Sequence, residues 1–241
     1  MKKVSDLKVQ IFADGAEIAV ISQMAQKPYI KGFTTNPTLM RKAGIADYKP
    51  FALEVLKVVP TLPLSFEVFS DDFAEMEKQA LEIASWGKNV YVKIPITNTK
   101  GEPAAPLVAK LAKAKVQVNV TAIMTLDQVK ETVAALQPDV ASYVSVFAGR
   151  IADTGVDPLP LMQECLRVMA PNPKAELIWA SPRELLNVFQ ADDIGCHVIT
   201  VTPDILNKLA LVGKDLGVYS LETVKMFYND ATAAGFSIST K

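Results

Sequence analysis

Short runs of β-branched and other apolar residues alternate with segments of helical periodicity along the whole of this 241-residue chain. Most of the runs are nearly continuous in apolar residues, as expected of parallel strands that are buried on both faces. Their starts lie 20 to 33 residues apart, which is the length of a strand, a helix and their loops. The eight runs lie at residues 10–13, 31–35, 64–69, 90–96, 116–123, 143–148, 176–180 and 196–201.

Eight such units in a chain of this length predict an α/β fold, the single-domain (β/α)₈ TIM barrel, over residues 1–241. A doubly wound open sheet is the alternative, but it normally has fewer strands or a longer chain. No linker, repeat or change in composition divides the sequence. We therefore expect one domain.

Four segments outside the runs carry helix signals. Residues 71–86 place their apolar side chains on one stripe. Residues 125–136 open with Thr-x-x-Gln and residues 181–190 with Ser-x-x-Glu, and both patterns are typical of capping boxes. Residues 220–235 have apolar side chains at helical spacing. We expect this last helix either to close the barrel or to pack on a neighbouring subunit.

Composition excludes several classes of protein. The 25 basic and 26 acidic side chains leave no excess of positive charge for a nucleic acid. A single histidine and two cysteines argue against a zinc finger, a His-rich metal site and a disulfide scaffold. No apolar stretch reaches the roughly 18 residues of a membrane span, and the charged N-terminus predicts no signal peptide. We expect a cytoplasmic protein without membrane contact, whose chemistry uses lysine, arginine, carboxylates, amides and hydroxyls.

In this fold the working residues project from the carboxyl ends of the strands. Lys93 stands out, because a buried, charged and unpaired lysine inside a strand is costly. It either reaches the rim or pairs with Glu67 of the third run, or it serves as a Schiff-base nucleophile. Desolvation lowers the pKa of a lysine and frees its neutral amine for attack. Asp14, at the end of the first run, either caps the following helix or takes part in catalysis.

Two residues of the fifth run, Asn119 and Thr121, lie on the same strand face because they are two positions apart. If this face is the barrel interior, they lie beside Lys93. They either satisfy each other or form a wall that binds hydroxyl groups.

Basic and hydroxyl residues after the sixth and seventh runs indicate an anion site. Arg150, Ser181 and Arg183 can hold an anion through guanidinium groups and the N–H groups of a helix start. This is the usual phosphate position of the fold. As alternatives, Ser181 and Glu184 only cap a helix, and Arg150 pairs with Asp153.

Seven short motifs, one at each of the first seven runs, resemble the transaldolase family of class I aldolases, in the short branch that includes the fructose-6-phosphate aldolases. The motifs occur in order, so the resemblance spans about residues 10 to 230. They are Ala13-Asp14-Gly15, Gly32-Phe33-Thr34-Thr35-Asn36-Pro37-Thr38, Ser65-Phe66-Glu67-Val68, Tyr91-Val92-Lys93-Ile94-Pro95-Ile96-Thr97, Val118-Asn119-Val120-Thr121, Ser145-Val146-Phe147-Ala148-Gly149-Arg150 and Ala180-Ser181-Pro182-Arg183.

The resemblance implies an enzyme of carbohydrate metabolism that needs no metal or organic cofactor. Lys93 forms an imine with the C2 carbonyl of a ketose phosphate, and Asp14 acts as general base on the C4 hydroxyl. Cleavage of C3–C4 releases an aldose phosphate, and the retained dihydroxyacetone unit passes to a second one, as in the pentose phosphate pathway. Glu67 and Thr121 position a water that moves protons. The substrate-binding residues implied are Thr35, Asn36, Asn119, Ser145, Phe147, Arg150, Ser181 and Arg183.

Two positions separate the close relatives. The similar fructose-6-phosphate aldolases usually have a tyrosine in place of Phe147 and a glutamine in place of Glu67. Phe147 has no proton to give to the enamine, so the resemblance favours a transaldolase over an aldolase that releases free dihydroxyacetone. Pro182 and Val146 depart from the family pattern next to the anion site. A transaldolase for a modified sugar, such as a sulfonated one, therefore stays open.

Further alternatives come from other classes. A catalytically silent barrel that binds sugar phosphates would lack Lys93 or Asp14, and both are present. Deoxyribose-phosphate aldolases, which also use a Schiff base, lack the stretch at residues 34–37. The short branch commonly forms pentamer-based rings and decamers, so the resemblance implies a homo-oligomer. The partners expected are small sugar phosphates, without nucleic acid.

Overall fold

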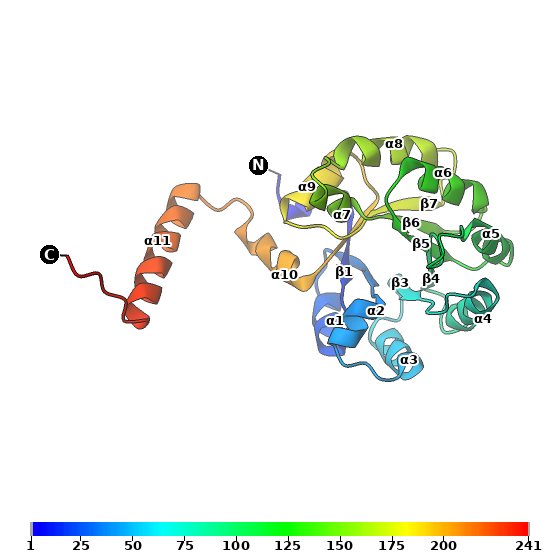
Figure 1. Ribbon diagram of the computed structural model, residues 1–241, viewed down its shortest axis with the longest axis horizontal. Helices are drawn as coiled ribbons and strands as arrows, with labels where there is room; N and C mark the ends of the chain where they lie inside the picture. The colour runs from blue at the N-terminus through cyan, green and yellow to red at the C-terminus, as the bar shows by residue number, and fades with distance from the viewer. Residues whose placement is uncertain (1, 241) are drawn as a thin grey trace.

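The computed structural model describes residues 2–240 and contains a closed barrel of eight parallel strands in chain order (Figure 1). The predicted TIM barrel is confirmed, and each predicted strand is present with ends shifted by a few residues. The strands are β1 (Gln10–Asp14), β2 (Ile30–Thr34), β3 (Leu64–Glu67), β4 (Val90–Pro95), β5 (Val118–Ile123), β6 (Ser142–Val146), β7 (Ala175–Trp179) and β8 (Val198–Val201).

Helices follow the strands and form the outer layer of the barrel (Figure 1). The α-helices are α1 (Ile18–Ala25), α2 (Pro37–Lys42), α3 (Tyr48–Val58), α4 (Phe73–Ala84), α5 (Ala105–Lys113), α6 (Leu126–Ala135), α7 (Ala148–Asp153), α8 (Leu159–Met169), α9 (Leu186–Asp193), α10 (Pro203–Leu206) and α11 (Leu216–Ala233). Two 3₁₀ turns, η1 (Val4–Asp6) and η2 (Asn207–Leu211), complete the described elements.

One of the two predicted capping boxes is confirmed and the other is wrong. Thr125 accepts the N–H of Gln128, whose side chain returns to the backbone of Thr125. At residues 181–190, in contrast, α9 begins only at Leu186. Ser181 has a φ of +60°, a left-handed conformation. The N–H groups of Arg183 and Glu184 donate instead to the side chain of Asn187, at 2.8 and 3.1 Å.

The amino-terminal half of the barrel interior is filled by aromatic rings. Phe12 lies edge-on to Tyr143 with ring centres 5.6 Å apart, and Tyr91 lies 4.3 Å from Tyr143. Gly32 makes room for this layer, because a Cβ atom there would come within 2.6 Å of the Phe12 ring. Several inward residues nearer the carboxyl ends are polar, among them Lys93, Asn119 and Ser145. The candidate site therefore lies at that end of the barrel.

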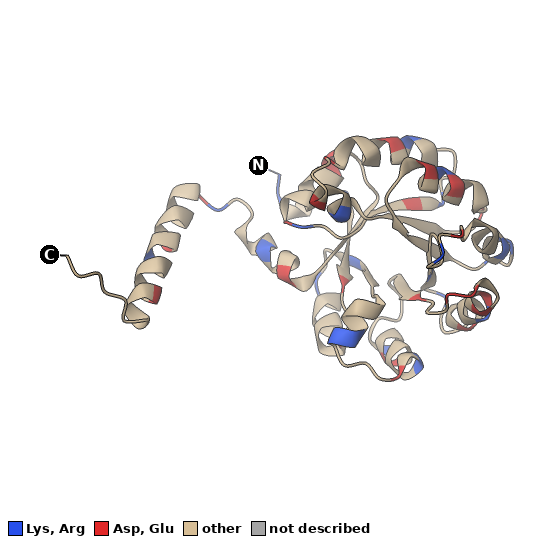
Figure 2. Ribbon diagram, viewed as in Figure 1, with Lys and Arg blue, Asp and Glu red and all other residues tan. Residues whose placement is uncertain are grey.

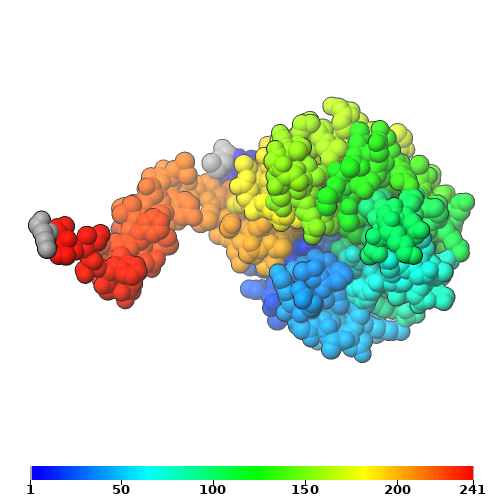
Figure 3. Space-filling model, in the orientation of Figure 1, coloured from blue at the N-terminus to red at the C-terminus, as the bar shows by residue number. Residues whose placement is uncertain are grey.

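The helix α11 projects away from the barrel (Figures 1 and 3). It begins four residues before the predicted start, and none of its described residues is buried. It therefore does not close the barrel. Charges of both signs are mixed over the barrel helices, whereas α11 is mostly uncharged (Figure 2). No helix within residues 2–240 is long and apolar enough to cross a membrane.

Candidate active site

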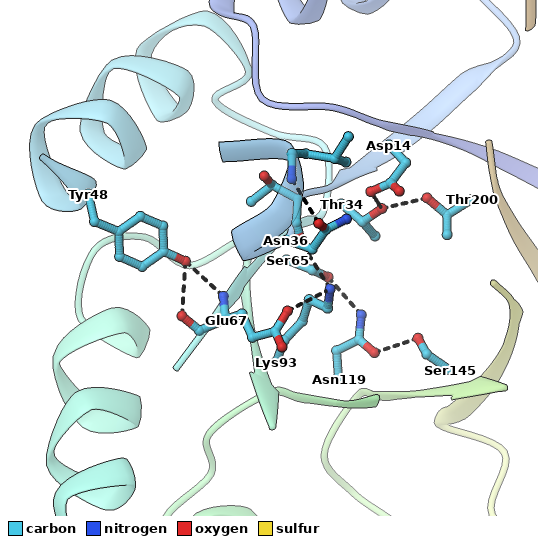
Figure 4. A network of polar contacts seen from close by, with 12 residues as sticks. Asp14, Thr34, Asn36, Tyr48, Ser65, Glu67, Lys93, Asn119, Ser145 and Thr200 are labelled. Carbon is cyan, nitrogen blue, oxygen red and sulfur yellow. Dashed lines mark hydrogen bonds and ion pairs between the residues drawn. The ribbon is translucent and has the colours of Figure 1, made fainter. Parts of the chain in front are cut away.

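Lys93 projects from β4 into the polar end of the barrel, where it is buried and held by two partners (Figure 4). Its Nζ donates to the backbone carbonyl of Thr35 at 2.8 Å and lies 3.0 Å from Oε2 of Glu67. Glu67 and Lys93 are register partners on neighbouring strands, so the fold itself fixes this contact. The pair offsets part of the cost of burying either charge.

Asp14 ends β1 and accepts a hydrogen bond from the Thr34 hydroxyl at 2.7 Å. The same hydroxyl contacts that of Thr200 on β8. Burial raises the pKa of Asp14 above its usual range, although the positive charge of Lys93 and the bond from Thr34 oppose the rise. The helix-capping alternative for Asp14 is wrong, because α1 begins at Ile18 with Glu17 in the cap position. Its carboxylate contacts β2 through Thr34 instead of the start of α1.

Asn119 connects three strands at the centre of the site. Its Oδ1 accepts from Ser145 of β6 at 2.7 Å, and its Nδ2 donates to Ser65 of β3 at 3.0 Å (Figure 4). Thr121 lies two residues further along β5 and is also buried. Ala122 follows with a φ of +63° at an irregularity in the ladder of β5, a feature that re-aims side chains at strand ends. The bonds of Asn119 to Ser65 and Ser145 thus place its amide in the barrel interior.

The two residues after β2, Thr35 and Asn36, make different kinds of contact. Asn36 caps α2, since its Oδ1 accepts the N–H of Leu39 at 3.0 Å. Thr35 contacts Lys93 through its carbonyl rather than its side chain. The buried Thr35 hydroxyl has no hydrogen-bond partner in the part of the chain that the structure describes.

The predicted anion residues gather between α7 and the loop after β7. A Cβ atom on Gly149 would lie 1.5 Å from the carbonyl oxygen of Ser181 and 3.4 Å from Nε of Arg183, so only glycine permits this contact. Asp153 pairs with Arg183, at 2.9 Å between Oδ1 and Nε, and not with Arg150 as the alternative proposed. The bonds from Arg183, with a smaller effect of Arg150, hold the pKa of Asp153 below its usual range.

Arg150 remains exposed, with its guanidinium carbon 5.3 Å from the centre of the Phe147 ring. It forms no ion pair with the other residues in the range 2–240. The helix start expected in this loop is absent, because α9 begins at Leu186. An anion here would therefore meet two arginine side chains and the loop itself rather than a helix N-terminus.

The chain matches the family described as Transaldolase/Fructose-6-phosphate aldolase over residues 11–238. It belongs to this family. A "probable transaldolase" of Dehalococcoides mccartyi is 35% identical over 202 residues, which cover 83% of this chain and 90% of the relative. A "probable transaldolase 2" of Listeria monocytogenes is 32% identical over 205 residues, covering 83% and 88%. The resemblance inferred from the seven motifs is thus confirmed.

One solved structure, from Burkholderia cenocepacia J2315 and provisionally named a phosphonomutase, covers 92% of this chain and 94% of its own. Its TM-score is 0.57 at 12% sequence identity, so the likeness concerns the barrel fold alone.

Four residues at the site of this transaldolase-family chain were not predicted from the sequence: Thr34, Tyr48, Ser65 and Thr200. Three of them had a detectable signal. Ser65 lies two positions before Glu67 on the same strand face, Thr34 ends a strand, and Thr200 is the polar residue of an otherwise apolar strand. Tyr48 had no such signal, because it begins a helix 19 residues before its partner Glu67.

Proposed function

We propose that this protein is a transaldolase, which transfers a dihydroxyacetone unit from a ketose phosphate to an aldose phosphate through an imine on Lys93. Fructose 6-phosphate and sedoheptulose 7-phosphate are the donors proposed, as in the pentose phosphate pathway. The observation that carries the proposal is the amine of Lys93, buried in the barrel 3.0 Å from Glu67 and near Asp14. A buried amine beside a carboxylate that can take its proton is suited to nucleophilic attack on a carbonyl.

The reaction begins when Glu67 accepts a proton from Lys93 and the neutral amine attacks C2 of the ketose. Loss of the C2 oxygen as water leaves a protonated imine, with proton transfer through a water held by Glu67 and Thr121. Asp14 then takes the proton of the C4 hydroxyl, the C3–C4 bond breaks, and its electron pair moves toward the imine nitrogen. The aldose phosphate leaves, and the enamine attacks the C1 carbonyl carbon of the acceptor aldose phosphate. The carbonyl oxygen becomes a hydroxyl by taking the proton back from Asp14. Hydrolysis of the new imine frees Lys93.

The remaining polar residues hold the substrate. Asn119 and Ser145 form hydrogen bonds with the sugar hydroxyls around the imine, as do Thr35 and Asn36. Arg150, Ser181 and Arg183 bind the terminal phosphate. Arg183 must then share its guanidinium between Asp153 and the phosphate, which suits a group whose ion pair is exposed and therefore weak.

Reduction with borohydride in the presence of fructose 6-phosphate tests the imine, and peptide mass spectrometry locates it. The adduct is expected on Lys93. Absence of an adduct with every ketose phosphate tried would refute the mechanism.

The side chain of Phe147 distinguishes the transaldolase from the fructose-6-phosphate aldolase. Without erythrose 4-phosphate as acceptor, the protein is expected to release little free dihydroxyacetone. Phe147→Tyr supplies a hydroxyl that can protonate the enamine, so release without acceptor should rise about tenfold or more. Both rates are measured by coupled assay, and transfer to erythrose 4-phosphate in the same variant is the control for an intact site. Rapid release of dihydroxyacetone by the unmodified protein would instead favour the aldolase.

The proposal includes a homo-oligomer, because no residue in the range 2–240 buries the side chains of α11. Apolar side chains lie on all sides of this helix, and Leu216, Phe227 and Tyr228 are 80%, 63% and 71% exposed. A helix that is apolar all round is normally buried. Exposed apolar surface of this kind is typical of a protein interface. The proposed cover is a second copy of the chain, in a pentamer or a decamer.

Removal of residues 214–241 is therefore expected to convert the oligomer into monomers, as measured by sedimentation. Val224→Asp with Phe227→Asp should have the same effect with the helix still present, because two charges at the interface oppose burial. Lys225→Gln on the same helix is the control and should leave the assembly intact. A monomeric full-length chain would contradict the oligomer.

A further inference from the structure

The hydrogen-bond ladder between β2 and β3 changes partners where it reaches the candidate active site. Phe33 donates its N–H to Pro63 at 2.8 Å, and Thr35 donates to Ser65 at 3.3 Å. Bonds in a parallel ladder are evenly spaced, with alternate residues serving as donor and acceptor. The regular next step would therefore join the N–H of Glu67 to the carbonyl of Thr35.

The structure replaces this step with two other bonds. The N–H of Glu67 donates to the hydroxyl of Tyr48 at 2.7 Å, and the carbonyl of Thr35 accepts from Nζ of Lys93 at 2.8 Å. The Tyr48 hydroxyl also donates to the carbonyl of Glu67 at 3.1 Å (Figure 4). One phenol thus satisfies both backbone polar groups of the residue that pairs with the proposed nucleophile.

Tyr48 itself is held firmly by its surroundings. It is the first residue of α3, and its ring contacts Phe66, Phe69 and Trp86 with ring centres 6.1, 4.5 and 5.5 Å away. Burial raises the pKa of Tyr48, so the hydroxyl keeps the proton that it donates to Glu67. The hydroxyl is therefore a fixed donor and acceptor at the end of β3.

We propose that Tyr48 is a positioning residue for the proposed transaldolase chemistry. By taking the N–H of Glu67, its hydroxyl leaves the Thr35 carbonyl to Lys93 and fixes the Glu67 carboxylate opposite the amine. Without the hydroxyl, the partly buried N–H of Glu67 needs a new acceptor, because an unpaired backbone group is costly. The Thr35 carbonyl is its ladder partner, so Glu67 and Lys93 then compete for one oxygen.

Tyr48→Phe tests the inference, which rests on the proposed function. The rate of imine formation is measured in single turnover, by quenching with borohydride and quantifying the Lys93 adduct with fructose 6-phosphate. We expect this rate to fall about tenfold, in line with the loss of one well-placed hydrogen bond, while KM changes by less than about twofold. The matched control is Tyr143→Phe, which removes a buried hydroxyl that interacts with Tyr91 and not with Glu67. It is expected to form the imine at the rate of the unmodified protein.

Two kinetic results would overturn the positioning role: an unchanged rate in Tyr48→Phe, or equal slowing in Tyr143→Phe, which would indicate general loosening of the barrel. A crystal structure of Tyr48→Phe gives a readout that needs no substrate. In it, we expect Glu67 to donate to the Thr35 carbonyl and Lys93 Nζ to have left that oxygen. If Glu67 and Lys93 keep their positions, the inference fails, whether or not the unmodified protein forms an imine. A missing adduct in the unmodified protein refutes the proposed function alone.

Discussion

Lys93→Ala is expected to lower kcat by roughly 10⁴-fold or more and to abolish the adduct trapped by borohydride, because the variant lacks the amine that forms the imine. The amine is buried and is held in place by the Thr35 carbonyl and the Glu67 carboxylate. Turnover is measured with fructose 6-phosphate and erythrose 4-phosphate. Peptide mass spectrometry after reduction measures the adduct.

Alanine also leaves the Glu67 carboxylate without its positively charged partner. This loss by itself destabilises the folded protein. Lys93→Arg is the matched control for this effect. Arginine keeps the positive charge beside Glu67 but cannot form an imine, since it stays protonated. We expect this variant to fold normally and to be equally inactive. An adduct on a different lysine, or turnover in Lys93→Arg, would contradict the assignment of the nucleophile.

The parts of the site that the sequence predicts well are those set by strand periodicity. Residues on one strand face at the carboxyl end of a barrel strand must converge, and Glu67, Lys93 and Asn119 do so as register partners on β3, β4 and β5. Their types and positions were therefore sufficient to place them together. The same logic accounts for Asp14, which ends β1 beside Thr34.

The predictions that failed depend on contacts between distant parts of the chain. The Ser-x-x-Glu pattern at residue 181 is a sound local signal, but the close contact with Gly149 and the side chain of Asn187 fix a different loop there. Similarly, Arg150 and Asp153 are three residues apart on one helix, yet the carboxylate of Asp153 pairs with Arg183, from the loop after β7. Local patterns do not reveal such competitors. Tyr48 belongs to the same class, because its partner Glu67 is defined only by the packing of α3 on the barrel.

Asp14→Asn is expected to stop carbon–carbon cleavage while leaving imine formation possible. As general base, Asp14 accepts the C4 hydroxyl proton, and loss of such a group costs about 10²–10⁴-fold in kcat. The amide retains an oxygen that can accept from Thr34, so the geometry of the site should persist. We expect the Lys93 adduct with fructose 6-phosphate to form and to accumulate. A variant that forms no adduct would show that Asp14 acts earlier than proposed.

The raised pKa of Asp14 is expected to contribute to the pH dependence of both activity and stability. The base must be ionised, so kcat of the unmodified protein should fall with decreasing pH at values above the ordinary 3.8 of an aspartate. For stability the sign is opposite. A carboxyl whose pKa is higher in the folded than in the unfolded chain stabilises the fold below its unfolded pKa, and this contribution is lost as pH rises through the folded value.

Asp14→Asn should therefore be more stable than the unmodified protein at pH 7, because it removes a partly buried carboxylate whose desolvation outweighs the attraction of Lys93. The difference in the free energy of unfolding should narrow as the pH is lowered through the raised pKa of Asp14, where the carboxyl becomes protonated. Urea denaturation at pH 7 and pH 5 measures this difference. A variant that is less stable at pH 7 would contradict the unfavourable burial of the Asp14 charge. A more stable and inactive variant, in contrast, would indicate that the charge of Asp14 lowers the stability of the fold and is needed for its role as general base.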